Sequence, residues 1–564
     1  MQIERDAVFV TADGETLRAD IYRPDELPAP VILQRTPYTK DWHTELGERL
    51  AAAGYIGIIQ DVRGQNASSG EWAPFVHEAG DGAAAVEWAA RIDGSTGEVA
   101  MIGSSYAATC ALQAASRRPE SLVAVVAAET PADYYDDMVY PGGAFALAFV
   151  ETWLTRNVAN SAAGRLPDGD EIQKLMNDVY TGAMDSAFRF APPAALPALL
   201  PDRKDVAPYF ADWLGPHRTR TPYWDDISLR PVLADIEVPV LNIGGWYDIF
   251  VSGTTENHRR LTAAGRESRL LLGPWSHNMW GRSLNGTDFG PDAEFDYPAE
   301  AIAWVDRCLG TRRDGNPGST RRGGGPGSKG RRFDTPVRFF TGGDNSWHEA
   351  NQWPPADAVT IELPLRADGG LGGQPGAPAE VGFRSDPADP VPAQGGHSCC
   401  YQPQSPMGPA DQRSVEARND VLSFTTETSD EPWTVAGPVE VALTLTADVV
   451  DTDMTAVLTD VGPDAASVNL TEGVLRASHR HGSAAPVALV PGQPAALRIK
   501  LHPIAHTVLP GHRLRLNLAG SLFPTYERNT NTGRQDIALS EATVAHISVH
   551  TGGDSGSTLI VRRR

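Results

Sequence analysis

Short, wholly apolar runs alternate with helical stretches in the first half of this chain. The runs lie at residues 30–33, 56–59 and 99–102, and the helical stretches at 46–53, 80–91 and 107–115. Strands that are apolar on both faces are typical of a parallel sheet covered by helices on both sides. Further apolar runs at 238–243 and 268–272 continue the pattern, which predicts an α/β fold with a mostly parallel sheet.

The rest of the chain predicts additional domains. With 564 residues it is too long for a single hydrophobic core. Segment 132–228 loses the strand pattern and is rich in aromatic residues and proline, which indicates a helical cap inserted into the α/β domain. Short alternating strands after residue 336 indicate a β-sandwich or jelly roll. The predicted division is an α/β domain in two parts (1–131 and 229–310), a cap (132–228), a Gly/Arg-rich linker (311–336) and a C-terminal jelly roll (337–564).

Composition excludes several classes of partner. The formal net charge of −23 argues against nucleic acid, because phosphate binding needs a positive face. No basic, then apolar, segment opens the chain, and no apolar run approaches the roughly 18 residues of a membrane span.

Four cysteines do not make a disulfide framework, and we interpret the adjacent Cys399 and Cys400 as ordinary thiols. A cytoplasmic protein without a membrane partner is expected.

The strongest local signal for chemistry is the stretch from Gly103 to Ala107. An apolar strand runs into a tight turn and then into a helix, which is the context of a nucleophile elbow. The elbow places a serine at the tip of a sharp turn, where the residues two before and two after it must be small. Gly103 and Ala107 fill those positions, so Ser105 rather than Ser104 is the candidate nucleophile.

An acid and a histidine follow the two later strands of the predicted sheet. Asp248 comes after the run 238–243 and a Gly-Gly pair, and His277 comes after the run 268–272 and a Gly-Pro pair. A serine needs a base to take its proton, and the base needs an acid to hold its tautomer. In α/β-hydrolases these partners follow in the order Ser, Asp/Glu, His. Ser105, Asp248 and His277 have that order, which predicts a catalytic triad.

At this point a family resemblance becomes specific. The chain resembles the cocaine-esterase-like (CocE/NonD) hydrolases, which are related to X-Pro dipeptidyl-peptidases and α-amino-acid ester hydrolases. The matching stretches run through the whole chain in family order: RTPY at 35–38, QDVRG at 60–64, ASSGE at 67–71, GSSY at 103–106, YPGG at 140–143, GWYD at 245–248, GPWSH at 273–277, DPADPVP at 386–392, DTDMTAVLTD at 451–460 and LPGHRLR at 509–515. The resemblance implies an α/β-hydrolase domain with a helical cap and a C-terminal jelly roll.

The resemblance also implies roles for individual residues. Ser105 corresponds to the nucleophile, His277 to the general base and acid, and Asp248 to the orienting carboxylate. Tyr38 corresponds to the tyrosine whose hydroxyl completes the oxyanion hole beside the backbone N–H of Tyr106. No cofactor or metal is implied, and a homodimer is expected.

Substrate preference is harder to predict. Enzymes that bind a free substrate amine need carboxylates to meet the ammonium, whereas Ile249 and Phe250 follow Asp248 here. This favours a neutral, apolar or aromatic acyl group on a small-molecule ester. Phe250 corresponds to an acyl-contacting aromatic in the resembled family. The other candidate acyl-pocket aromatics are Trp246, Trp153, Tyr134 and Tyr135.

Two groups of charged residues receive structural interpretations. We interpret Asp133, Asp136 and Asp137 as a solvated helix start, because carboxylates are favoured at helix N-termini. We interpret Asp61 and Arg63, which directly follow a buried strand, as an ion pair that braces the site.

The sequence therefore predicts a serine esterase that acts through an acyl-enzyme. An amidase or X-Pro dipeptidyl-peptidase on the same fold, and an acyltransferase using the same acyl-enzyme, remain open alternatives. A carbohydrate-binding role for the jelly roll is a fourth hypothesis, against which a complete triad argues.

Overall fold

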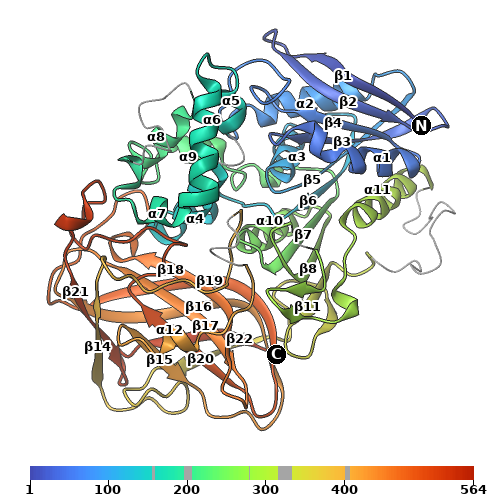
Figure 1. Ribbon diagram of the computed structural model, residues 1–564. Coiled ribbons are helices and arrows are strands. Elements are labelled where there is room, and N and C mark those ends of the chain that lie inside the picture. The colour runs from blue at the N-terminus through green and yellow to red at the C-terminus, as the bar shows by residue number, and fades with distance from the viewer. Residues whose placement is uncertain (155–158, 196–205, 279, 315–332, 401–406) are drawn as a thin grey trace.

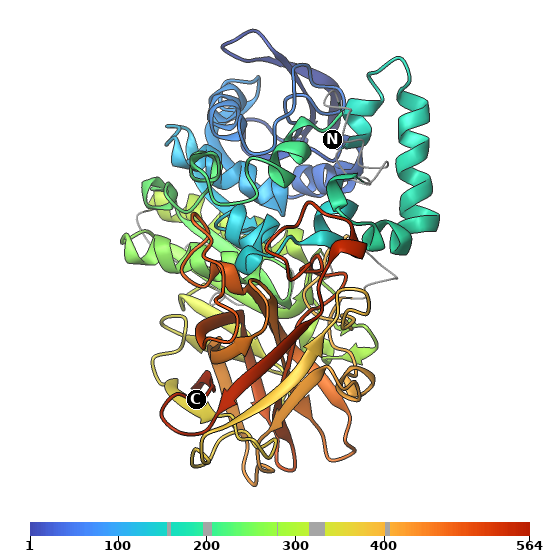
Figure 2. The ribbon, with the colours of Figure 1, turned by 90° about the vertical axis from the view of Figure 1, so that its left-hand side faces the viewer.

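The computed structural model describes residues 1–154, 159–195, 206–278, 280–314, 333–400 and 407–564. Residues 315–332 of the predicted linker lie outside the described residues. Figure 1 shows three parts in contact: an α/β part in blue and green, a helical insert in teal, and a β domain in yellow to red below both. Turning the molecule keeps the insert to one side of the α/β part and the β domain beneath it (Figure 2).

A ten-stranded sheet organises the α/β part, in the order β1-β2-β4-β3-β5-β6-β7-β8-β11-β12. The six pairings from β4-β3 to β8-β11 are parallel, and antiparallel strands close both edges. The strands are β1 (Gln2–Val10), β2 (Thr16–Arg23), β3 (Ala29–Thr36), β4 (Ile56–Asp61), β5 (Ser95–Ser104), β6 (Leu122–Ala128), β7 (Val240–Tyr247), β8 (Ser268–Ser276), β11 (Val337–Thr341) and β12 (Ser346–Ala350). The fold class predicted from the apolar runs is confirmed.

Helices cover both faces of this sheet. On one face lie α2 (Glu78–Ala89) and α3 (Tyr106–Ser116), and on the other α1 (Thr44–Ala52) and α11 (Tyr297–Asp314). Helix α10 (Val251–Ala263) follows β7. Because both faces are covered, strands β4, β6 and β7 are buried along their whole length. The carboxyl ends of the parallel strands meet at one edge, where the predicted triad residues follow β5, β7 and β8.

A helical insert separates β6 from β7. Its helices are α4 (Leu147–Thr152), α5 (Ala159–Ala163), α6 (Gly169–Asp178), α7 (Met184–Arg189), α8 (Pro208–Leu214) and α9 (Pro222–Ile227). Buried aromatic residues of the insert, such as Trp213 and Trp224, belong to the same apolar core as α2 and α3. The insert therefore packs directly over the face of the sheet that carries the elbow helix.

The C-terminal β domain consists of two antiparallel sheets around a core of their own. One sheet has the order β13-β22-β16-β21-β14, with β19 also paired to β16, and the other has the order β15-β20-β17-β18. Its elements are β13 (Val359–Pro364), β14 (Ala379–Ser385), α12 (Arg413–Glu416), β15 (Val421–Thr425), β16 (Trp433–Ala447), β17 (Asp453–Val461), β18 (Ser467–Arg476), β19 (Ala495–Val508), β20 (Arg513–Ala519), β21 (Ala545–Thr551) and β22 (Thr558–Arg563).

The two strands that follow residue 336 belong to the sheet of the α/β part. Strand β11 pairs with β8, and β12 pairs with β11 at the edge of the α/β sheet, so the separate β sheets begin only at β13. The alternation of β11 resembles that of a sandwich strand, and only its pairing with β8 assigns it to the first sheet. A short hairpin, β9 (Ser283–Leu284) with β10 (Thr287–Asp288), precedes α11.

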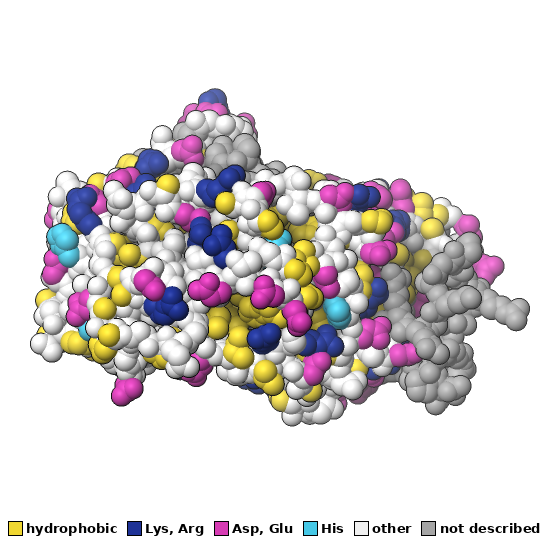
Figure 3. Space-filling view, turned by 90° about the horizontal axis from the view of Figure 1, so that it is seen from below, with side chains coloured by type: hydrophobic (Ala, Val, Ile, Leu, Met, Phe, Trp, Pro, Cys, Tyr) yellow, Lys and Arg dark blue, Asp and Glu magenta, His cyan; other side chains and the backbone are white. Residues whose placement is uncertain are grey.

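The two large parts share an apolar junction. Trp246 and Leu270 of the α/β part pack there with Trp353, Ala436 and Ala505. Figure 3 shows the molecule from below, with Lys and Arg side chains interspersed among Asp and Glu on that face. None of the helices in the described ranges combines the length and apolarity that a bilayer crossing requires.

Candidate active site

Ser105 occupies a strained turn between β5 and α3. Its backbone has φ 60° and ψ −127°, a conformation that L-residues rarely adopt. The Ser105 N–H donates to the Ala128 carbonyl of β6 at 2.9 Å, which fixes the turn against the sheet. Ser105 is 8% exposed, so its side chain lies in an almost closed space.

Gly103 explains why this turn can form. A Cβ atom on Gly103 would lie 2.3 Å from the carbonyl carbon of Ala107, closer than any real contact. The strand and the first turn of α3 can therefore meet only if residue 103 has no side chain.

Gly103→Ala is expected to lower the free energy of unfolding by about 3 kcal/mol or more, because the backbone of α3 must shift. Gly80→Ala in the exposed part of α2 is the matched control, since its Cβ would meet nothing within 4 Å. The control is expected to be neutral or stabilising by up to about 1 kcal/mol. Denaturant unfolding measures both variants, and equal stabilities would contradict the steric account.

His277 and Asp248 come together at the ends of β8 and β7. The distance from His277 Nδ1 to Asp248 Oδ1 is 2.7 Å, and both side chains are buried. This hydrogen bond orients the imidazole and leaves Nε2 for a substrate or nucleophile. The residues beside the pair connect it to the elbow, since Ser104 Oγ donates to Asn278 Oδ1 at 2.7 Å.

Tyr38 lies beside Ser105. Its hydroxyl accepts a hydrogen bond from Trp153 Nε1 at 3.0 Å and is hydrogen-bonded to the Ser105 side chain. Burial raises the pKa of Tyr38 to about 12, so the phenol stays protonated and can donate at neutral pH. Trp153 is one of the aromatic residues that the sequence predicts in the acyl pocket. In the structure its indole N–H contacts the Tyr38 hydroxyl, so Trp153 lies beside the candidate site.

Tyr106 begins helix α3 directly after Ser105. The first N–H groups of a helix have no partner within the helix, so the Tyr106 N–H is free to face an oxyanion. The Tyr106 phenol points the other way and is held by Glu78 Oε1 at 3.0 Å and by the Phe75 N–H at 2.9 Å. Its side chain thus anchors the helix start.

Of the other predicted pocket aromatics, Phe250 lies at the site. Its ring meets the His277 ring edge-to-face at 5.4 Å between centroids, and Phe149 of α4 packs on it at 5.7 Å. The insert therefore contributes to the wall beside the histidine.

Three predicted pocket residues are engaged elsewhere. The Tyr134 ring stacks on the Phe75 ring with 3.8 Å between the ring centroids. The Tyr135 hydroxyl donates to the Arg218 carbonyl at 3.0 Å within the insert. Trp246 donates from Nε1 to the Phe340 carbonyl at 2.6 Å in the junction core. These aromatic rings are core residues, which sequence alone does not distinguish from pocket residues.

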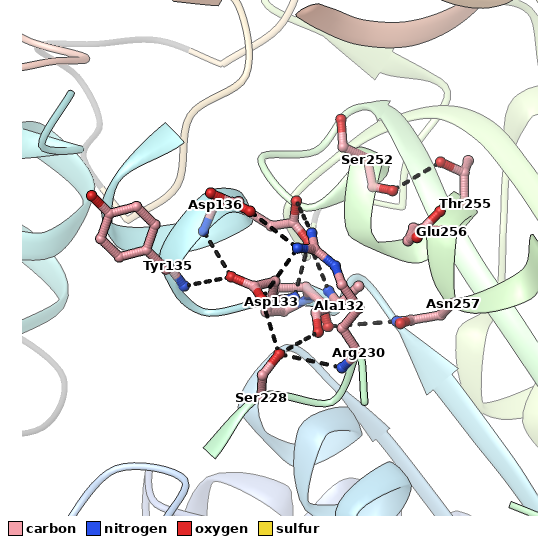
Figure 4. A network of polar contacts seen from close by, with 12 residues as sticks. Ala132, Asp133, Tyr135, Asp136, Ser228, Arg230, Ser252, Thr255, Glu256 and Asn257 are labelled. Atoms are coloured by element: carbon pink, nitrogen blue, oxygen red, sulfur yellow. Dashed lines mark hydrogen bonds and ion pairs between the residues drawn. The ribbon is translucent and has the colours of Figure 1, made fainter. Parts of the chain in front are cut away.

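The acidic group at the start of the insert differs from the solvated helix start that we expected. Asp133 is fully buried and pairs with Arg220 at 2.7 Å and Arg230 at 3.3 Å. Figure 4 shows Arg230 directed at Asp133 and Asp136, with Ser228 hydrogen-bonded to Asp133. Two arginines distant in the sequence neutralise these carboxylates, a contact that no local pattern could reveal.

The predicted Asp61–Arg63 ion pair is also wrong. Arg63 forms a bidentate pair with Asp81 at 2.7 and 2.9 Å and a second pair with Asp13 at 2.6 Å. Asp61 instead accepts the backbone N–H of Lys40 at 2.8 Å, and burial raises its pKa to about 6. Both residues brace loops near the site, but with different partners.

Cys399 and Cys400 differ from the ordinary thiols that we expected, because the structure joins them in a disulfide. The neighbouring Ser398 forms an isolated parallel β-bridge with Asp248 through the backbone, so this segment lies against the loop of the candidate acid.

Glu129 is the residue that the sequence reasoning missed. It is fully buried after β6, and its Oε2 lies 3.7 Å from His277 Nδ1. Glu129, Asp248 and His277 are the one group of three His, Cys, Asp or Glu residues in the described ranges whose ligand-type atoms all lie within 4.8 Å. We assign no metal there, because Nδ1 is already hydrogen-bonded to Asp248. A carboxyl directly after a wholly apolar strand was the available signal.

Comparison with known proteins decides the family. The chain is 31% identical to the cocaine esterase of Rhodococcus sp. (strain MB1 Bresler) over 97% of its own length and 96% of the relative's. The chain belongs to the cocaine-esterase-like (CocE/NonD) family of hydrolases. Residues 13–279 match the X-Pro dipeptidyl-peptidase (S15 family) description, and residues 332–560 match the X-Pro dipeptidyl-peptidase C-terminal non-catalytic domain.

Solved structures share the architecture of this family member over its whole length. An α-amino acid ester hydrolase superposes with a TM-score of 0.82 at 23% identity, covering 100% of this chain and 96% of that one. An aminopeptidase from a marine sediment Thaumarchaeota archaeon gives 0.81 at 24% identity, with the same coverages. At these identities the likeness concerns the fold.

Proposed function

We propose that the protein is a serine hydrolase that cleaves carboxylic esters through an acyl-enzyme. The observation that carries this proposal is the hydrogen bond between His277 Nδ1 and Asp248 Oδ1 at 2.7 Å, at the edge where Ser105 occupies the elbow. The 31% identity to a cocaine esterase over nearly the whole chain supports the ester class.

In the proposed mechanism, His277 takes the proton of Ser105 as the serine oxygen attacks the ester carbonyl. Asp248 holds the imidazole and stabilises the imidazolium that forms. The Tyr38 hydroxyl and the Tyr106 N–H donate to the oxyanion. His277 then protonates the departing alcohol, and water repeats the sequence on the acyl-enzyme.

We propose a neutral, apolar or aromatic acyl group. Phe250, Phe149 and Trp153 lie around His277 and Tyr38, where an acyl chain would be placed. A substrate ammonium needs a carboxylate without a cation of its own. Asp133 is already paired with two arginines, and the fully buried Glu129 already accepts the Asn278 N–H beside His277, which supports the ester over an aminoacyl substrate.

Substrate panels test this proposal. We expect benzoyl and short acyl esters to be hydrolysed with a kcat/KM at least about 100-fold above that of aminoacyl-prolyl anilides, a difference of about 2.7 kcal/mol in transition-state binding. Mass spectrometry of the quenched reaction is expected to find the acyl group on Ser105. Faster turnover of the anilides would decide for an X-Pro peptidase, and transfer to added alcohols in preference to water would decide for an acyltransferase.

Location and assembly stay proposals. We propose a cytoplasmic protein that forms a homodimer, for which light scattering would give twice the chain mass of 60.4 kDa. A mass of one chain would refute the dimer.

A further inference from the structure

Glu129 is a buried carboxyl that the proposed mechanism does not use. It follows the last residue of β6 with φ 50°, an unusual conformation for a residue with a side chain. Its N–H donates to the Ile243 carbonyl of β7 at 2.7 Å. The backbone is thus held against the sheet, which directs the side chain to the edge where β5, β7 and β8 end.

The Glu129 carboxyl connects the two loops that carry the nucleophile and the base. Its Oε2 accepts the Asn278 N–H at 2.7 Å and the Ser104 hydroxyl at 3.3 Å. Asn278 follows His277 and Ser104 precedes Ser105. The same oxygen lies 3.7 Å from His277 Nδ1. Glu129 is therefore placed to influence both the position of the imidazole and its charge.

Two buried oxygens near His277 have no hydrogen-bond partner among the described residues: Glu129 Oε1 and Asp248 Oδ2. A carboxyl oxygen of each residue lies within 4.8 Å of the other. Buried polar atoms normally have a partner, because desolvation without one is costly. A proton on one carboxyl would supply a donor between the two acids.

Electrostatic repulsion between Glu129 and Asp248 also favours a proton on one of the two carboxyls. Two ionised carboxylates at this separation in a buried site repel strongly, so one proton is retained between them. Burial, and then the charge of Asp248, raise the pKa of Glu129 well above its usual value. Two further titratable groups face Glu129: the His277 imidazole, with Nδ1 at 3.7 Å, and the Tyr297 phenol of α11, whose own pKa is raised by burial and by Glu129.

We propose that Glu129 is a positioning residue that holds a proton beside Asp248, so that the two carboxyls together present a single negative charge to His277. This inference rests on the triad proposed above. Glu129 then has two roles. Its hydrogen bonds connect the histidine loop to the elbow, and its proton limits the negative charge that the two carboxyls present to His277 Nδ1 to one unit.

The arrangement has a consequence for variants of Asp248. When Asp248 is replaced by asparagine, its repulsion of Glu129 disappears, while burial still raises the pKa of Glu129. An imidazolium with Nδ1 3.7 Å from Glu129 Oε2 then favours the ionised carboxyl, so that Glu129 gives up its proton to solvent as His277 becomes charged and supplies the negative charge near Nδ1. Loss of the orienting aspartate typically costs about 10⁴-fold in serine proteases, and a reserve carboxylate reduces that loss.

The experiment is a double-mutant cycle of Asp248→Asn and Glu129→Gln in the full chain, with kcat/KM for an aryl ester measured from pH 5 to 9. Glutamine keeps the size of Glu129 and an acceptor for Asn278 but cannot ionise. We expect Glu129→Gln to lose about 3-fold, Asp248→Asn about 10²-fold and the double variant about 10⁴-fold, so that the effects are not additive.

The pH profile separates this role from a structural one. In Asp248→Asn, the pH at which kcat/KM falls on the acid side of the profile is expected to stay within about half a pH unit of the wild-type value. In the double variant this pH is expected to lie about one unit lower, because no carboxylate remains beside His277 to favour the imidazolium. Glu151→Gln in α4 is the matched control, since Glu151 is also a fully buried carboxyl whose pKa burial raises. It is expected to leave the Asp248→Asn profile unchanged.

Two results would overturn the inference. One is equal rates and profiles for Asp248→Asn and the double variant. The other is an acid limb shifted down by a full unit in Glu129→Gln alone, which would mean that Glu129 is ionised in the wild type. Thermal unfolding and covalent labelling of Ser105 verify that each variant is folded. Hydrolysis by wild type that does not depend on Ser105 would instead overturn the proposed function, and this inference with it.

Discussion

Ser105→Ala is expected to lower kcat for ester hydrolysis by about 10⁶-fold, the largest effect of any single substitution in this chain. Removing the nucleophile of a serine triad costs about as much as removing the whole triad, because its members act as a unit. The residual rate over water would come from the proposed oxyanion donors Tyr38 and Tyr106, which do not depend on the serine.

Two measurements check this expectation. Active-site titration with a nitrophenyl ester should give a burst of one acyl group per chain in wild type and none in Ser105→Ala. Ser104→Ala is the matched control, since Ser104 is the neighbouring hydroxyl and its Oγ is engaged with Asn278. It is expected to keep the burst and lose less than about 10-fold in rate. A burst that survives in Ser105→Ala, or disappears only in Ser104→Ala, would remove Ser105 from the mechanism.

The parts of the fold that were predictable depend on local patterns. Wholly apolar strands, a glycine where a Cβ would meet the Ala107 backbone, and acids or bases directly after strands all appear in short stretches of sequence. These patterns predicted the parallel sheet, and they predicted that Ser105, Asp248 and His277 follow strands that end at one edge. The hydrogen bond of His277 to Asp248 then follows from the order of β7 and β8 in the sheet.

The parts that were not predictable depend on distant contacts. Arg63 finds Asp81 and Asp13 rather than Asp61, and Asp133 finds Arg220 in the insert, because pairing is decided by which elements pack together. Strand β11 looks like its successors but pairs with β8. Glu129 lacks a family motif of its own, and only the juxtaposition of three loops shows that it faces His277.

Tyr38→Phe is expected to lower kcat by about 10²–10³-fold while changing KM by less than about 3-fold, because in the proposed mechanism the phenol donates to charge that develops only in the transition state. The change removes a single oxygen, which is hydrogen-bonded to Ser105 and accepts from Trp153 Nε1 at 3.0 Å. The expected loss corresponds to about 2.7–4 kcal/mol of transition-state stabilisation.

Trp153→Phe is the matched control for this prediction. It removes the donor that positions the phenol but leaves the phenol itself, so a loss of about 3- to 10-fold is expected. Since burial raises the pKa of Tyr38 to about 12, the phenol should remain a donor through the alkaline range, and the difference between wild type and Tyr38→Phe should be constant from pH 7 to 10. Steady-state kinetics over that range measure it. A gap that closes at pH 9, or a tenfold rise in KM at constant kcat, would show that Tyr38 binds the substrate rather than its transition state.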